Sequence, residues 1–154
     1  FLDFARPLEA EQMAAEADLN VVIAAALERH IREGRPVHFT PGATAPARLR
    51  AQAIQRLVVN LVENALRHGS PPVEVSTSRE ANINVIEVAD RGPGIPAADA
   101  ERMLQPFTRM NSARSTSGTG LGLAIVDRIA RMHGGSVKLL AREGGGLRVR
   151  VELP

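Results

Sequence analysis

An apolar stripe over residues 52–68 limits the folds open to this 154-residue chain more than any other stretch. Its members recur every three or four positions, which places them on one broad face of a helix. Gly69 and Pro71 follow at once, and both residue types end helices. The stripe consists of Ile54, Leu57, Val58, Leu61, Val62, Ala65 and Leu66. We therefore predict a helix over residues 52–68 that packs on a second layer.

Two further amphipathic helices are predicted. The first is capped by Asp18 or Asn20 and runs to about Glu33, and the second covers residues 118–133 and stops at two glycines. The residues expected to face inward are Leu19, Ile23, Leu27 and Ile31 in the first helix, and Leu121, Ile125, Ile129 and Met132 in the second.

Five strands are predicted from short runs rich in β-branched residues. They are Val37–Thr40, residues 73–79, Ile83–Ala89, Ser136–Ala141 and Leu147–Leu153. The second and third are expected to pair, and the last two to form a hairpin. This order of elements predicts the α+β class. The expected architecture is a two-layer α/β sandwich with about three main helices on a mixed, largely antiparallel five-stranded sheet.

The composition of the chain excludes several classes of function. The sequence pI is about 10.3, but the net charge is only +2 and the arginines are scattered, so we do not expect nucleic-acid binding. Cysteine is absent, which excludes disulfides and thiolate chemistry. The longest apolar runs, such as residues 21–27, are too short to cross a bilayer, so this piece is expected to be soluble.

Asn60 and Asn64 lie four positions apart on the predicted 52–68 helix, so their amides share a face at the edge of the apolar stripe. Asparagine is a mediocre helix former, and a surface or capping role is the ordinary explanation for such a pair. The functional alternative is that the Asn64 oxygen binds Mg²⁺, which prefers oxygen ligands. Arg67 and His68 follow one turn later and would lie near the same ligand.

Two glycine-containing motifs come later in the chain. Residues 90–94 read Asp-Arg-Gly-Pro-Gly directly after a predicted strand, where a carboxylate can accept a hydrogen bond from an amine such as that of adenine. Residues 118–123 read Gly-Thr-Gly-Leu-Gly-Leu and open a predicted helix, whose N–H groups suit phosphates. An ordinary turn and a flexible loop are the alternatives. Neither motif is a Walker sequence or a dinucleotide fingerprint, because the single lysine lies elsewhere and the glycine spacing differs.

The stretch between these motifs, residues 90–117, has little predicted structure beyond a short turn around residues 98–104. Such a stretch in a compact domain is usually a lid or a disordered loop. It contains Phe107, a core anchor or a ligand contact, and Arg109, a solvated charge or a cation for a terminal phosphate.

Together and in this order, these motifs resemble the N, G1, F and G2 boxes of the sensor histidine kinases of two-component systems. The resemblance covers about Leu19 to Leu153, and residues 105–126 look most like the osmosensing EnvZ-type kinases. It implies the Bergerat (GHKL) ATP-binding fold and the ligands ATP and Mg²⁺. The implied reaction transfers the γ-phosphoryl group of ATP to a histidine imidazole.

The resemblance also implies roles for individual residues. Asp90 would bind the adenine amine, and Asn64 would hold Mg²⁺ with Asn60 beside the phosphates. The base pocket would be lined by Gly92, Gly94 and Ile95, and the phosphates would be contacted by Arg67 and by the segment Gly118, Thr119, Gly120, Leu121 and Gly122. His68 stands where the family often has tyrosine, which puts stacking on the base in doubt.

Residues from about 96 to 117 would form the ATP lid, which holds Phe107 and brings Arg109 near the γ-phosphate. Asn60, Glu63 and Arg109 are the catalytic candidates. Glu63 would orient or deprotonate the acceptor imidazole, or would be an ordinary surface glutamate, and the sequence leaves both roles open.

The acceptor itself is expected outside the chain, because none of the four histidines lies in a phosphoacceptor motif of the family. Residues 1–10 are expected to be the remnant of a dimerisation helix or linker, and residues 11–154 the catalytic domain. The implied partners are the histidine-bearing dimerisation domain of the same parent protein and a response regulator. The parent would be a homodimeric bacterial inner-membrane protein, and this cytoplasmic domain would be a monomer by itself.

Three other functions stay open. Topoisomerase II, Hsp90 and mismatch-repair ATPases share the fold, but they use a water-activating glutamate at the position that Asn60 occupies here. An anti-sigma-factor serine kinase and a degenerate nucleotide-binding regulator are the other two.

Overall fold

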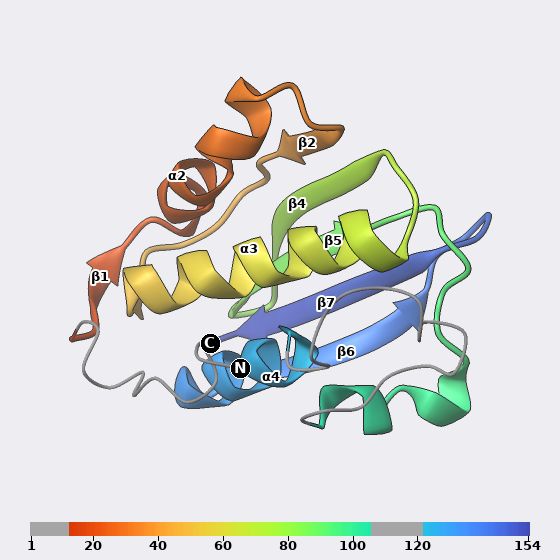
Figure 1. Ribbon diagram of the computed structural model, residues 1–154. Helices are drawn as coiled ribbons and strands as arrows, with labels where there is room; N and C mark the ends of the chain where they lie inside the picture. The colour runs from red at the N-terminus through yellow and green to blue at the C-terminus, as the bar shows by residue number, and fades with distance from the viewer. Residues whose placement is uncertain (1–12, 106–121) are drawn as a thin grey trace.

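The computed structural model describes residues 13–105 and 122–154 and arranges them in two layers. Within these residues the α-helices are α2 (Leu19–Arg32), α3 (Ala51–His68) and α4 (Gly122–Met132). All three lie on one face of a sheet, with α3 between the other two (Figure 1). This arrangement confirms the predicted two-layer α+β sandwich.

The sheet orders its strands β2-β4-β5-β7-β6. β2 runs parallel to β4, and the other three pairs are antiparallel, so the sheet is mixed and largely antiparallel, as predicted. The bounds of its strands are β2 (Val37–Thr40), β4 (Val73–Glu80), β5 (Ile83–Ala89), β6 (Ser136–Ala141) and β7 (Leu147–Leu153). β5 is the central strand.

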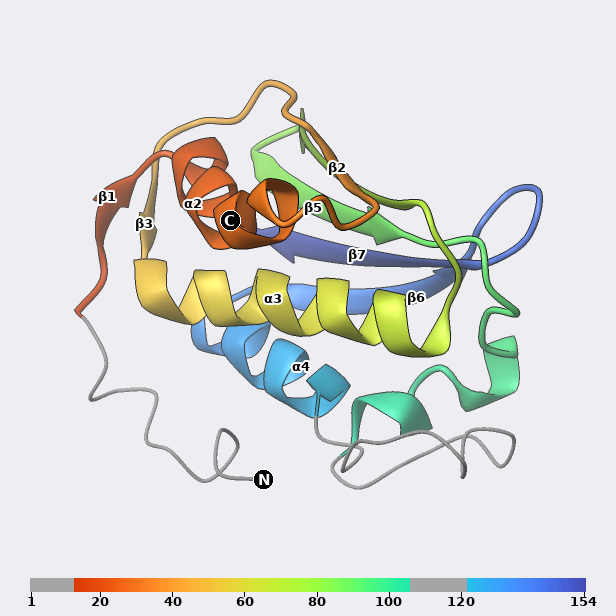
Figure 2. The ribbon, with the colours of Figure 1, turned by 45° about the horizontal axis from the view of Figure 1, so that its top comes forward.

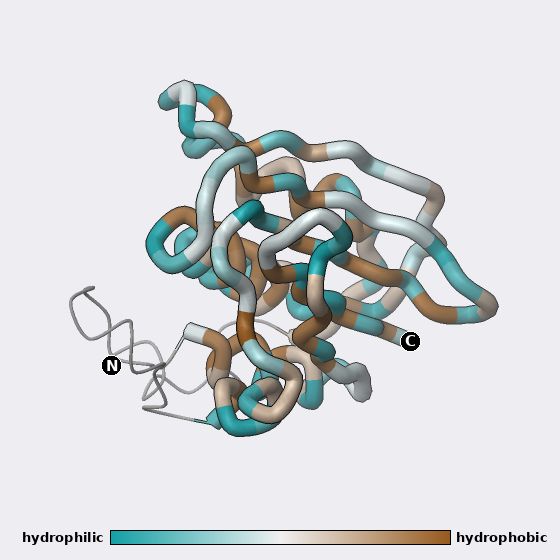
Figure 3. Tube along the Cα trace, turned by 90° about the vertical axis from the view of Figure 1, so that its right-hand side faces the viewer, coloured by the Kyte–Doolittle hydropathy of each residue, from teal (hydrophilic) through white to brown (hydrophobic). Residues whose placement is uncertain are grey.

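Apolar side chains of the two layers form one core. Across the sheet, Val75, Val88 and Val149 stand in register and are buried. On α3, every residue of the predicted stripe is buried or packs against the core, which confirms the helical periodicity. Figure 3 shows hydrophobic stretches running through the middle of the molecule, with hydrophilic residues mostly on the outer loops. No helix among the described residues is long and apolar enough to span a bilayer.

α2 departs from the prediction at one position. Ile31 is 51% exposed, whereas the neighbouring His30 is only 7% exposed. The inward position three residues after the buried Leu27 is residue 30, so the helical period turns His30 toward the core. Its Nε2 lies 2.6 Å from Glu63 Oε2 on α3, and this partner allows the imidazole to be buried. The prediction that Ile31 faces inward was therefore wrong.

A second, two-stranded sheet adds to the predicted fold. β1 (Ala15–Ala17) pairs antiparallel with β3 (Ala47–Leu49). Each strand has only three residues, too few for a recognisable alternation of apolar and polar positions. Asp18 follows β1 and caps α2 by accepting a hydrogen bond from the Asn20 N–H, so it is the cap among the two expected candidates.

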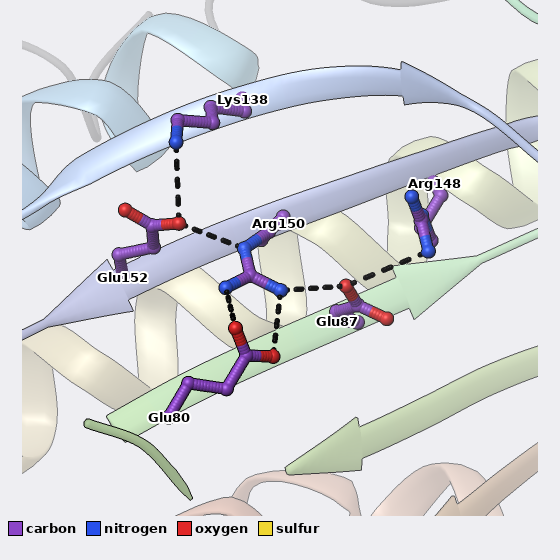
Figure 4. Close-up of polar contacts among 6 residues, drawn as sticks. All are labelled: Glu80, Glu87, Lys138, Arg148, Arg150 and Glu152. Atoms are coloured by element: carbon purple, nitrogen blue, oxygen red, sulfur yellow. Dashed lines mark hydrogen bonds and ion pairs between the residues drawn. The ribbon is translucent and has the colours of Figure 1, made fainter. Parts of the chain in front are cut away.

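Charged side chains cover the face of the sheet that points away from the helices (Figure 4). Arg150 lies at the centre of this group and binds Glu80 at 2.7 Å, Glu152 at 2.8 Å and Glu87 at 3.4 Å. Val85 shares this face, in register with Glu152, and is fully buried, so the aliphatic parts of the charged side chains cover it. We call the group the Arg150 network, and its members are Glu80, Glu87, Lys138, Arg148, Arg150 and Glu152.

Candidate functional site

α3 carries the two asparagines that the sequence analysis singles out. Asn60 and Asn64 are both half-buried at the edge of the apolar face. The Nδ2 group of Asn60 donates to the Arg56 carbonyl at 2.8 Å, which leaves its Oδ1 facing the start of α4. A methyl group placed on Gly122, the first residue of α4, would lie 3.9 Å from that oxygen. The fold therefore brings the asparagine motif and the end of the second glycine motif together.

Asp90 follows β5 directly and is almost fully buried, with 4% exposure. Its N–H donates to the Leu147 carbonyl at 3.0 Å. Its Oδ1 accepts from the N–H groups of Gly92 at 2.8 Å and Leu147 at 3.4 Å. No hydrogen bond from residues 13–105 or 122–154 reaches Oδ2. Because a carboxylate oxygen only accepts hydrogen bonds, Oδ2 is suited to an N–H group of a ligand.

Gly69 is a site residue that the sequence analysis missed. It ends α3, where its N–H donates to the Ala65 carbonyl, and it packs directly against Asp90. A methyl group on Gly69 would lie 2.6 Å from both carboxylate oxygens of Asp90, closer than real contacts allow. The sequence around Gly69 predicts only the end of a helix, because a contact between two distant segments leaves no signal in either one.

The β6–β7 turn lies on the other side of Asp90. Gly146 has a φ of 107°, in the region that favours glycine, and a side chain there would strike the Asp90 carbonyl oxygen. A methyl group on Gly94 would lie 3.0 Å from the Gly146 carbonyl oxygen. Ile95 is half-buried and packs against the core. Gly92 and Gly94 thus lie next to the glycines that contact Asp90, and the β6–β7 turn, predicted only as a hairpin connection, lies there too.

Glu63 faces α2 and makes two contacts there. Its Oε2 lies 2.6 Å from His30 Nε2 and 3.7 Å from Arg35 Nη1. The Glu63 side chain is 37% exposed, whereas that of His30 is 8% exposed. A carboxylate at this distance fixes the proton of a neutral imidazole on Nε2. Glu63 therefore connects α3 to α2.

The remaining predicted residues lie around the C-terminal end of α3. Arg67 and His68 are exposed in its last turn. The expected turn around residues 98–104 forms as two short 3-10 helices, η2 (Ala97–Asp99) and η3 (Arg102–Leu104). Figure 2 shows this segment at the same end of the molecule as the end of α3 and the start of α4.

Part of the predicted site lies outside the described residues. These positions are Phe107, Arg109, Gly118, Thr119, Gly120 and Leu121, together with the expected lid beyond residue 105. The predicted start of the 118–133 helix falls there too, and its described part, α4, begins at Gly122.

The donors at this site suit a metal ion that arrives with its ligand. Among the described residues, no three His, Cys, Asp or Glu side chains gather into a group that could hold a metal ion. Asn60 and Asn64 offer neutral amide oxygens, which are hard donors. Mg²⁺ usually takes one or two protein oxygens and fills its other positions with phosphate oxygens and water. The residues present therefore fit Mg²⁺ bound to a polyphosphate.

A family model matches most of the chain. Residues 50–154 match the model described as Histidine kinase-, DNA gyrase B-, and HSP90-like ATPase. The match begins at the residue before α3 and includes every site residue discussed above except His30 and Arg35.

Two curated relatives have sensor functions in their names. Sensor protein CutS of Streptomyces coelicolor is 42% identical over 106 residues, which cover 66% of this chain and 26% of that protein. Sensor-like histidine kinase SenX3 of Mycolicibacterium smegmatis is 36% identical over 145 residues, which cover 89% of this chain and 38% of that protein. The chain thus spans about a quarter to two-fifths of the length of these relatives.

Solved structures share the fold. The NMR structure of the histidine kinase domain of the E. coli osmosensor EnvZ has a TM-score of 0.72 and 38% identity, and the match covers 94% of this chain and 90% of that one. The mycobacterial sensor histidine kinase MprB has a TM-score of 0.73 and 27% identity, with 92% and 97% covered. These matches confirm the predicted resemblance to the sensor histidine kinases, including the EnvZ type.

Proposed function

The chain belongs to the histidine kinase-, DNA gyrase B- and HSP90-like ATPase family as the catalytic domain of a sensor histidine kinase, and we propose that it binds Mg·ATP at the C-terminal end of α3. The observation that carries this proposal is Asp90, a nearly buried carboxylate with one oxygen left for a donor. That oxygen would accept a hydrogen bond from the exocyclic amine of adenine.

The triphosphate would extend from Asp90 along α3 toward the start of α4. Asn64 lies five residues before Gly69, about 7.5 Å along the helix axis, and its amide oxygen would bind the Mg²⁺ that accompanies the phosphates. Gly122 stands at the N-terminus of α4, where backbone N–H groups favour negative charge. Mg²⁺ supplies charge neutralisation when bound, and exposed Arg67 would add a phosphate contact.

The reaction would be phosphoryl transfer to a histidine outside this chain. A nitrogen of the acceptor imidazole would form a bond to the γ-phosphorus while the bond to the β–γ bridging oxygen breaks. ADP would leave, and the imidazole would lose a proton to a base. The residues of this chain would contribute position and charge, since the nucleophile comes from the partner.

In this proposal, the partners of the catalytic domain follow from the longer parent protein to which it would belong. The acceptor histidine would lie on the dimerisation domain of the same homodimeric parent, and the phosphoryl group would pass on to a response regulator. The parent would be anchored in the bacterial inner membrane with this domain on the cytoplasmic side. The isolated domain would be a monomer.

Contacts of Glu63 support a structural role over a catalytic one. Its carboxylate is held by buried His30 and by Arg35. Releasing it to serve as a base would leave His30 buried with neither nitrogen bonded, because the described residues give its Nδ1 no partner. Glu63→Gln should therefore lower stability more than it lowers the rate of phosphoryl transfer.

Sustained ATP hydrolysis, as in a gyrase or HSP90, is the competing function. It needs a base to activate water, and a glutamate in place of Asn60 would provide one. The Asn60 amide cannot accept a proton, and its nitrogen already donates to the Arg56 carbonyl. An amide in place of a carboxylate at residue 60 therefore supports transfer over hydrolysis.

Calorimetric titration with ATP tests the proposal. Wild-type protein should bind ATP more tightly with Mg²⁺ than without it, Asn64→Ala should lose that Mg²⁺ dependence, and Asp90→Ala should bind at least ~10-fold more weakly. Exposed Asn82→Ala is a matched control that should bind as the wild type does. Absence of ATP binding by folded wild-type protein would overturn the proposal.

Labelled ATP separates transfer from hydrolysis. The chain alone should acquire no stable label, and label should appear on a dimerisation domain added in trans. A steady release of phosphate with no acceptor present would favour the hydrolytic alternative.

A further inference from the structure

Asp90 is enclosed by main-chain atoms from three segments. Gly69 at the end of α3 packs against its carboxylate, and Gly146 in the β6–β7 turn packs against its carbonyl. Gly92, two residues on, donates to its Oδ1 at 2.8 Å. The carboxylate is thus positioned by backbone rather than by flexible side chains, which fixes where Oδ2 lies.

Gly146 has a local reason to be glycine, and Gly69 does not. The φ of 107° at Gly146 disfavours any other residue in that turn. Gly69 has φ −96° and ψ −152°, an extended conformation that every residue type adopts. The helix could therefore end at this position with a side chain, as far as its own backbone is concerned.

The contact with Asp90 explains why residue 69 is glycine, which its backbone conformation does not require. A methyl group on Gly69 would lie 2.6 Å from both oxygens of the Asp90 carboxylate. Gly92 shares the requirement, because a methyl group there would lie 2.5 Å from Gly69 Cα. The Arg91 N–H donates to the Ser70 carbonyl at 2.9 Å, so the two segments cannot simply separate to make room.

We propose that Gly69 is a positioning residue for Asp90 and sets the preference of the site for adenine over other purines. The inference rests on the proposed function, in which Asp90 binds the base. Because Gly69 has no side chain, the Asp90 carboxylate packs directly on its backbone, and this contact holds Oδ2 in a single position. A side chain at residue 69 would push the carboxylate out of that position.

Inosine triphosphate is the probe for this preference. Adenine presents an amine donor at its position 6, whereas hypoxanthine presents a carbonyl acceptor there and carries a donor at N1. A fixed carboxylate facing position 6 repels the carbonyl and rejects inosine. A carboxylate that can turn reaches the N1 donor and tolerates it. Loss of the packing contact between Gly69 and Asp90 should therefore reduce the preference for ATP over inosine triphosphate, and not merely weaken the binding of both.

The experiment compares the affinities of ATP and inosine triphosphate for wild-type protein and Gly69→Ala by calorimetry. Wild-type protein should prefer ATP by at least ~10-fold, and the variant should lose most of that preference. Gly34→Ala is the control, because Gly34 has a φ of 73° and no atom within 4 Å of a built methyl group. It should lose stability through backbone strain and keep the preference.

A double-mutant cycle covers the case in which Gly69→Ala fails to fold. Asp90→Ser shortens the side chain that the new methyl group would strike, so the double variant should be more stable than Gly69→Ala alone. Unchanged discrimination in folded Gly69→Ala would overturn the inference and leave the proposed function intact. So would additive stability effects in the cycle. Wild-type protein that binds neither nucleotide would overturn both proposals.

Discussion

The two ends of β5 each bury one polar side chain, and the two side chains are bonded differently. Asn84, at the start of the strand, is 1% exposed, and Asp90, directly after its end, is 4% exposed. Asn84 Oδ1 accepts from the Ala45 N–H at 3.0 Å and from Arg79 at 3.1 Å, and its Nδ2 donates to the Ala45 carbonyl at 2.8 Å. Asp90 receives both of its hydrogen bonds from the described residues on Oδ1 alone.

Under the proposed function, this difference separates a polar group that stabilises the fold from one that binds a ligand. Both atoms of the Asn84 amide are satisfied within the chain, so a ligand would gain nothing from them. Asp90 receives no bond on Oδ2 from the described residues, so that oxygen can accept an N–H group of a ligand. One strand thus anchors a loop at one end and, under the proposed function, would hold the base-binding carboxylate at the other.

Asn84→Ala should have the largest effect, and it should act on stability alone. The substitution leaves the N–H and carbonyl of Ala45 without their partner, at a cost of about 1–3 kcal/mol for each group that water cannot reach. We expect the free energy of unfolding in urea to fall by about 3 kcal/mol, with the ATP affinity of the folded protein unchanged. Asn82→Ala, in the exposed turn before β5, is the control. A parallel loss of ATP affinity would break the comparison.

Asp90→Asn should reverse this pattern. Its remaining carbonyl oxygen can keep the hydrogen bonds from Gly92 and Leu147, but an NH₂ group would replace Oδ2 and, under the proposed function, would face the amine of adenine. We expect about 2 kcal/mol of lost binding energy, a roughly 30-fold weaker ATP affinity, with a smaller loss of stability than in Asn84→Ala. Calorimetry and urea unfolding on the same samples measure both quantities. A stability loss equal to that of Asn84→Ala with unchanged affinity would assign Asp90 a structural role.

The periodicity of apolar residues in the sequence predicts the helix layer and the sheet layer of the fold. The seven apolar residues of the α3 stripe are spaced so regularly that the helix and its buried face follow from them. β5 is predicted with its observed bounds, and Asp90 is a candidate site residue because it directly follows that strand. The three-residue strand β1 is too short to carry a period, so it is missed.

Contacts between distant segments are what the sequence does not reveal. Gly69 ends a helix whether or not it also contacts Asp90. Only the packing of α3 against Asp90 shows that a side chain is excluded at this position. His30 is buried and the adjacent Ile31 is exposed, and the burial of His30 depends on its contact with Glu63 of another helix. The bonding of Asn84 likewise depends on a loop far away in the chain. Each of these is a pairwise contact that neither segment encodes by itself.

His133 tests the Asn84 end through pH. It follows α4 near the end of β7, and its Nε2 accepts from the Arg50 N–H at 3.0 Å while Nδ1 donates to the Ile129 carbonyl at 2.8 Å. Burial lowers the pKa of His133 below its ordinary value of 6.5, against the opposing effect of that carbonyl. The folded protein therefore favours neutral imidazole, so this contribution is complete above pH 6.5 and is lost as the pH falls toward the lowered pKa.

We expect acidification from about pH 7.5 to about pH 5.5 to cost wild-type protein about 1 kcal/mol more than it costs His133→Ala, measured by urea unfolding. His38→Ala, on the exposed side of β2, should behave as the wild type does. ATP affinity should be equal in all three proteins at the higher pH, because His133 lies at the end of β5 that holds the fold. Equal acid sensitivity of wild-type protein and His133→Ala would show that the Arg50 contact contributes nothing.

Glu80→Gln should have the smallest effect, because the Glu80 side chain is 58% exposed and water screens its ion pair with Arg150. Hydrogen bonding to Arg150 holds the pKa of Glu80 below its ordinary value of 4.5. Its contribution is therefore present above pH 4.5 and is lost as the pH falls through the lowered pKa. The melting temperature of the variant should fall slightly at neutral pH and low salt, and the difference should shrink in high salt or acid. Exposed Glu101→Gln is the control. A change in ATP affinity in Glu80→Gln would connect the open face to Asp90, and β5 could then no longer be divided into a structural end and a binding end.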